Sequence, residues 1–120
     1  MTRRSETDKA ETFKYYWRIR KQEAGITPPE PVDEYRFMDD RKYHFDLAWP
    51  DLLVAVEVEG NAWHVKGGGK HMQDRDIWKY NYAQTLGWIV LRFSPAMLKK
   101  TPDSCIDIVL QNLNNRMEIK

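Results

Sequence analysis

The chain has 120 residues, of which 42% are hydrophobic and 12% aromatic, a composition that excludes a disordered chain and fits one domain spanning 1–120. Its 19 basic and 18 acidic residues give a net charge of +1, so any patch that binds nucleic acid must be local. The only cysteine, Cys105, excludes an internal disulfide and a cysteine-based zinc site. No apolar run reaches the roughly 20 residues of a membrane helix, and the first residues lack the apolar core of a secretory signal. We therefore expect a soluble, cytoplasmic protein that does not contact membranes.

Periodicity and turn residues predict seven elements. In chain order they are a helix over 5–24, strands over 32–37, 43–49 and 52–60, a helix over 72–86, a strand over 88–93 and a last helix from 102. The three consecutive strands have short turns, which indicates an antiparallel meander. The fold class is therefore α/β of the α+β type, with a mixed sheet.

Capping residues support the helix boundaries. Ser5 can cap the first helix and Gly25 can end it, while Gly87 follows the second. Ser94-Pro95 and Thr101-Pro102 each combine a capping residue with a proline at the first helical position.

The third strand begins apolar on both faces and ends on two carboxylates. Because strand side chains alternate, one face carries Leu53, Ala55, Glu57 and Glu59, and the other carries Leu52, Val54, Val56 and Val58. Such a strand is expected in the centre of the sheet. The same alternation in the second strand predicts Tyr43, Phe45, Leu47 and Trp49 on one face, and His44, Asp46 and Ala48 on the other.

Asp46 and Glu57 are expected to lie close together on neighbouring strands. A hairpin with a four-residue turn would place them directly opposite each other, and other registers of the same parity would leave them diagonal. With Glu59 they form a patch of carboxylates whose repulsion requires a cation. Oxygen ligands favour Mg²⁺ or Mn²⁺ over zinc. The alternative is ordinary ion pairs with Arg41, Lys42 or Lys79.

The order helix-strand-strand-strand-helix-strand, with Asp on the second strand and Glu57-Val58-Glu59 on the third, resembles the PD-(D/E)xK nuclease superfamily, whose core is restriction-endonuclease-like. Further stretches resemble small very-short-patch-repair endonucleases. These are 43–50 (Tyr-His-Phe-Asp-Leu-Ala-Trp-Pro) with 56–60 (Val-Glu-Val-Glu-Gly), and 79–81 (Lys-Tyr-Asn) with 87–93 (Gly-Trp-Ile-Val-Leu-Arg-Phe). The resemblance covers roughly residues 11 to 110.

This resemblance implies a catalytic site. Asp46, Glu57 and the backbone carbonyl of Val58 would be the metal ligands. Glu59 stands where the family has lysine and could orient or deprotonate the attacking water, while Lys79 could supply the missing positive charge from the following helix. His71 could protonate the leaving 3′-oxygen or hold the scissile phosphate; accessory roles are possible for His64 and Glu11. Helical spacing places Asp76, Lys79, Tyr80 and Ala83 on one side of that helix, and that side could face the cluster. A surface Lys79 paired with Asp76 is the competing interpretation.

The expected partner is DNA. Basic residues that could hold phosphates are Arg41, Lys42, Lys66 and Lys70, and Trp63 could stack on bases. We therefore expect a Mg²⁺- or Mn²⁺-dependent DNA endonuclease, either as a homodimer or within a larger nuclease complex. The alternatives are a nucleic-acid-binding module of the same fold without catalysis, and a protein-interaction domain whose acidic patch pairs with a basic partner.

Overall fold

The computed structural model describes residues 4–25, 27–59 and 73–119. In chain order the elements are α1 (Arg4–Ala24), β1 (Val32–Arg36), β2 (His44–Trp49), the 3₁₀ turn η1 (Pro50–Leu52), β3 (Val54–Val58), α2 (Asp74–Thr85), β4 (Ile89–Phe93), α3 (Pro95–Lys100) and α4 (Pro102–Ile119). This confirms the predicted order and adds the short helix α3, where the Ser94 side chain accepts a hydrogen bond from the Met97 amide. None of the helices in the described ranges is both long and apolar enough to cross a membrane.

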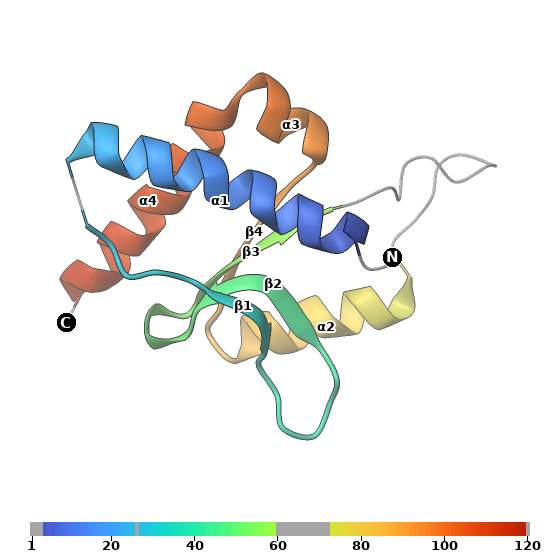
Figure 1. Cartoon of the computed structure of the whole chain (residues 1–120). Coiled ribbons are helices and arrows are strands. Elements are labelled where there is room, and N and C mark those ends of the chain that lie inside the picture. Colours follow the sequence, from blue (N-terminus) through green and yellow to red (C-terminus); the bar gives the residue numbers. More distant parts are fainter. Residues whose placement is uncertain (1–3, 26, 60–72, 120) are drawn as a thin grey trace.

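The four strands form one mixed sheet in the order β1-β2-β3-β4 (Figure 1). β1, β2 and β3 are antiparallel neighbours, and β4 is parallel to β3. Parallel neighbours need a crossover connection, and α2 lies within it. β3 is therefore a central strand, as its two apolar faces predicted.

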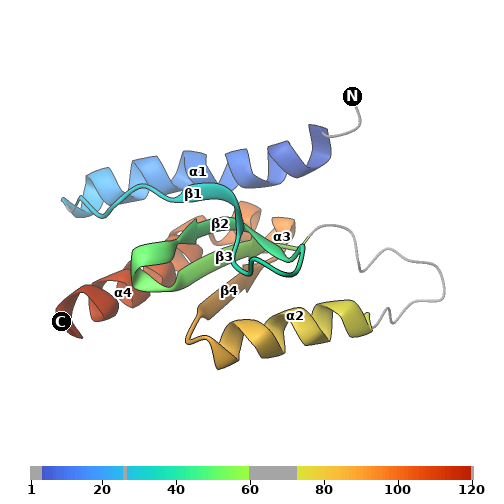
Figure 2. The ribbon, with the colours of Figure 1, turned by 90° about the horizontal axis from the view of Figure 1, so that it is seen from below.

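Helices cover both faces of the sheet. Figure 2 shows α1 on one side and α2 on the other. The larger core, on the α1 side, joins β2, β3 and β4 to α1, α3 and α4 through buried side chains that include Phe13, Trp17, Leu47, Val56, Ile106 and Leu113. The smaller core, on the α2 side, contains Phe45, Ala48, Ala55, Ala83 and Trp88. The mixed α/β class is thus confirmed.

The alternation of side chains breaks in the middle of β2. Phe45 packs in the smaller core, whereas Leu47 and Trp49 pack in the larger one, so the prediction that all three share a face was wrong. The break faces Glu34 of β1, because the strand pairs on either side are Asp33 with Leu47 and Tyr35 with Phe45. Glu34 has a left-handed φ of 47°, which turns both strands at this point.

β3 begins two residues later than predicted. Pro50, Asp51 and Leu52 form the 3₁₀ turn, and Leu53 closes it with a left-handed φ of 56°. The Leu53 carbonyl accepts a hydrogen bond of 2.9 Å from the Ile89 amide, which ties the turn to the start of β4. Trp49 and Val54 are paired across this four-residue connection.

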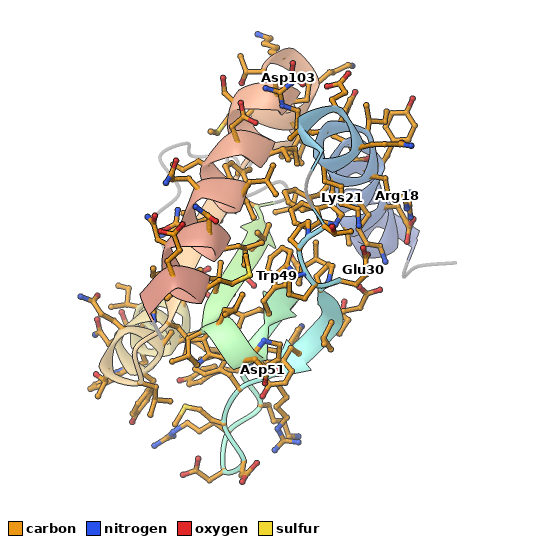
Figure 3. All side chains as sticks on the ribbon, turned by 90° about the vertical axis from the view of Figure 1, so that its left-hand side faces the viewer. Arg18, Lys21, Glu30, Trp49, Asp51 and Asp103 are labelled. Carbon is orange, nitrogen blue, oxygen red and sulfur yellow. The ribbon has the colours of Figure 1, made fainter. Side chains whose placement is uncertain are left out.

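The connector between α1 and β1 is held against the sheet. The Trp49 indole Nε1 donates to the Pro29 carbonyl at 2.7 Å, and Lys21 forms an ion pair with Glu30. Figure 3 shows Trp49, Lys21 and Glu30 close together. A hollow of about 290 Å³ opens here, lined partly by Pro50 and Asp51. It lies at the start of β3, whereas Glu57 lies near its end.

Candidate functional site

Asp46 and Glu57 lie where β2 and β3 leave regular pairing. The ladder pairs Leu47 with Val56, and the same register continued by one residue places Asp46 opposite Glu57, as the four-residue turn predicted. At this point the carboxylates take the place of backbone acceptors. The Asp46 amide donates to Glu57 Oε2 at 3.1 Å, and the Val58 amide donates to Asp46 Oδ2 at 2.8 Å. Each carboxylate thereby satisfies an amide on the opposite strand.

Glu57 is more enclosed than Glu59, whose side chain is 21% exposed. The Glu57 side chain is 13% exposed, and its Oε1 accepts hydrogen bonds from Lys79 Nζ at 2.9 Å and from the Tyr80 hydroxyl at 3.1 Å. Burial raises the pKa of Glu57, and the nearby Asp46 charge raises it further, while the Lys79 ammonium and the two hydrogen bonds oppose the shift. Desolvation thus disfavours the charged form of Glu57, and the Lys79 ammonium favours it.

Lys79 reaches Glu57 from α2, which covers this face of the sheet. Its side chain is only 11% exposed, so the alternative of a surface lysine paired with Asp76 was wrong. The rings of Phe45 and Tyr80 lie 5.5 and 5.3 Å from the ammonium. An ammonium enclosed in this way is stabilised by one carboxylate and two aromatic faces.

Tyr80 and Arg92 belong to the site. Helical spacing placed Tyr80 on the side of α2 that could face the cluster but gave it no role, and Arg92 was not predicted as a site residue. Arg92 lies on β4 beside Glu57, and its Nε donates to Glu59 Oε2 at 2.6 Å. The guanidinium lies 4.7 Å from the centre of the Tyr80 ring. The sequence signal was available in part, because Tyr80 follows Lys79 and Arg92 is the charged residue of an otherwise apolar strand.

These contacts perturb both groups. Burial raises the pKa of the Tyr80 phenol, and the negative charges of Glu57 and Glu59 raise it further, so the hydroxyl stays protonated and acts as a donor. Burial alone would lower the pKa of Arg92, but the hydrogen bond and the charge of Glu59 outweigh it and raise that pKa.

Comparison of this chain with models of protein families, with curated proteins and with solved structures finds no match.

The oxygen atoms around Asp46 and Glu57 fit a hard divalent cation that takes only a few of its ligands from the protein. In the ranges that the structure describes, no group of three or more histidine, cysteine, aspartate or glutamate side chains is arranged to hold a metal ion. Mg²⁺, however, keeps several waters and commonly uses only one or two carboxylates. Asp46, Glu57 and the Val58 carbonyl provide oxygen donors of this kind, and Asp46 Oδ1 accepts no hydrogen bond from the described residues.

The other predicted site residues lie in loops, on α1 or outside the described ranges. Arg41 and Lys42 are exposed in the loop before β2, and Arg41 donates to the Tyr82 hydroxyl on α2 at 3.0 Å. Glu11 is exposed on α1, on the other side of the sheet, and pairs with Lys14 at 3.4 Å. The predicted roles of Trp63, His64, Lys66, Lys70 and His71 fall on residues outside the described ranges.

Proposed function

We propose that the protein is a metal-dependent nuclease that hydrolyses phosphodiester bonds of DNA. The observation that carries the proposal is the convergence of Asp46, Glu57 and an enclosed Lys79 where β2 and β3 separate. The resemblance to PD-(D/E)xK nucleases implies this set of residues, and the observed element order is compatible with their core. Lys79 supports the proposal further. Glu59 occupies the strand position where the family has lysine, and Lys79 brings a lysine to the same site from α2.

In the proposed reaction a water oxygen bonds to phosphorus, the bond from phosphorus to the 3′-oxygen breaks, and that oxygen takes a proton. Glu59 Oε2 binds Arg92, which leaves Oε1 to orient or deprotonate the water. Lys79 stabilises the negative charge that develops on the phosphate oxygens. The raised pKa of Tyr80 keeps its hydroxyl donating to Glu57, which fixes that carboxylate. His71 remains the predicted donor of the proton to the 3′-oxygen.

Asp46, Glu57 and the Val58 carbonyl would hold the metal. When bound, a divalent ion supplies Lewis acidity toward phosphate oxygens and lowers the pKa of a bound water. The charge balance also favours an ion. The three carboxylates, Lys79 and Arg92 sum to a charge of −1, which repels phosphate, and a divalent cation would change the sum to +1.

The test is cleavage of supercoiled plasmid and of single-stranded DNA with Mg²⁺, Mn²⁺ or EDTA. Asp46→Asn is the informative variant, because the amide oxygen can still accept from the Val58 amide while the charge is lost. We expect its cleavage rate to fall by about 100-fold or more, since the ion contributes several kcal/mol to the transition state. Asp51→Asn removes the same charge at the exposed end of the hairpin and should leave cleavage unchanged. Cleavage by Asp46→Asn at the parental rate, in a folded protein, would refute the assignment.

A second candidate is a nucleic-acid-binding module without catalysis. It is favoured by the pairing of Glu57 with Lys79 and of Glu59 with Arg92, since both carboxylates already have cationic partners. DNA binding without cleavage under every metal would support this function over the first.

A further inference from the structure

Arg92 differs from the other charged residues of the site in how it is fixed. Its Nε is bound to Glu59 at 2.6 Å, and its guanidinium plane lies 4.7 Å from the Tyr80 ring centre. Tyr80 is itself held by its hydrogen bond to Glu57. A long and flexible side chain is therefore held in one orientation before any ligand arrives.

The Arg92 guanidinium still has N–H donors that could bind a ligand. Arginine has five N–H donors, and Glu59 accepts from one of them. In the part of the chain that the structure describes, the two terminal nitrogens donate no hydrogen bond. The Arg92 side chain is 37% exposed, compared with 11% for Lys79, so it is the more accessible cation.

Arg92 occupies a defined place relative to the carboxylates. Asp46, Glu57 and Arg92 follow one another on β2, β3 and β4, and Arg92 is the register partner of Glu57 in the parallel pair. Neighbouring strands lie about 4.8 Å apart, so the Arg92 side chain leaves the sheet about one strand spacing from Glu57 and about 10 Å from Asp46. A phosphate group beside Glu57 would be within reach of a side chain of this length.

From these observations we infer that Arg92 is a phosphate-binding residue, which Glu59 and Tyr80 hold in position to bind a nucleic-acid backbone phosphate beside Glu57. A planar guanidinium with two free edge nitrogens matches two phosphate oxygens, which lysine cannot do. Glu59 is in this view a positioning residue, and its occupation of the family's lysine position has a structural explanation. The inference deepens the proposed nuclease function and rests on it for the identity of the ligand.

The experiment measures binding of a fluorescein-labelled DNA duplex and a matching single strand by anisotropy, in Ca²⁺ and separately in EDTA, over a range of salt concentrations. Arg92→Gln is expected to raise Kd by about tenfold and to reduce the salt slope by about one, because one phosphate contact is lost. Arg92→Lys should recover the slope but only part of the affinity. Arg18→Gln removes the same charge from an exposed position on α1, across the sheet, and should change Kd less than twofold.

Circular dichroism of each variant confirms that it is folded, and Arg92→Lys serves in place of Arg92→Gln if the latter unfolds. Equal loss of affinity in Arg92→Gln and Arg18→Gln, or full affinity in Arg92→Lys, would overturn the inference. Parallel assays with Mg²⁺ separate it from the proposed function. A parental protein that binds through Arg92 but never cleaves would sustain the inference and refute the nuclease, whereas cleavage with an unchanged KM in Arg92→Gln would do the reverse. No DNA binding under any condition would overturn both.

Discussion

The enclosed pair of Lys79 and Glu57 makes a quantitative prediction about stability. Three variants test it: Lys79→Met, which keeps the length and apolar stem, Glu57→Gln, which keeps the shape and one oxygen acceptor, and the double variant. The two charges are 2.9 Å apart with side chains 11% and 13% exposed. Both are thus largely removed from water, and each depends on the other for compensation.

The magnitude follows from distance and burial. At an effective dielectric constant of about 20, unit charges 2.9 Å apart attract by about 6 kcal/mol, and desolvation offsets much of this. Removing one partner leaves a buried charge uncompensated, so each single variant should lower the free energy of unfolding by about 3–5 kcal/mol. The double variant removes both charges and should lose only about 0–2 kcal/mol, which gives a coupling energy of about 3 kcal/mol or more.

The pH dependence of stability gives a second, independent test of the pair. Lys79→Met removes the cation that opposes the burial-driven rise in the pKa of Glu57, so that pKa rises further. With the native pKa above the unfolded value, the native state binds more protons than the unfolded state between the two values. Stability should therefore be greatest below the unfolded pKa and fall as pH rises through the native pKa. Relative to the parental protein, the deficit of Lys79→Met should be smallest at acidic pH and should grow as the pH rises through the native pKa of Glu57.

Urea unfolding in EDTA, followed by tryptophan fluorescence at several pH values, measures these quantities. Two results would refute the reasoning. One is additive losses in the double variant, and the other is a deficit in Lys79→Met that does not change with pH. Either would mean that the pair is solvated in solution.

Three further substitutions test the backbone and the core. Glu34→Gly should raise the free energy of unfolding by about 1 kcal/mol relative to Glu34→Ala, because the left-handed φ of 47° strains any residue with a Cβ; equal stabilities in urea would contradict this. Gly87→Ala should lower it by about 1 kcal/mol or more, since φ is +90° and the new Cβ would lie 3.4 Å from Leu53 Cδ1; an unchanged thermal midpoint would count against it. Leu113→Ala, at a fully buried position in the larger core, should cost about 2–5 kcal/mol, and a loss below 1 kcal/mol would show that the cavity collapses.

Predictions from the sequence succeeded where one local rule determines the answer. Alternation placed Glu57 on the face opposite Val56, and the parity of the hairpin predicted that Asp46 would lie close to it; of the registers left open, the structure has the one with a four-residue turn. Helical spacing indicated that Lys79 could face the cluster, and it does. These outcomes need only parity, turn length and the helical repeat.

The errors have a different origin. Phe45 changes faces where β2 runs opposite Glu34, whose left-handed φ could not be foreseen because the position holds neither glycine nor asparagine. Arg92 was missed because β3 and β4 are parallel, and a crossover connection does not fix a register as a short hairpin does. Leu52 and Leu53 have the composition of a strand, but Pro50 begins a 3₁₀ turn that delays β3.

The left-handed residue in β1 has a consequence for association between molecules. β1 is an edge strand, and a flat edge would offer its free amides and carbonyls to the edge of another copy. The turn at Glu34 interrupts that row of backbone groups. Pro31 lies just before β1, and β1 itself carries the charged residues Asp33, Glu34 and Arg36. The strain at Glu34 therefore costs about 1 kcal/mol of folding free energy and at the same time opposes edge-to-edge aggregation of the sheet.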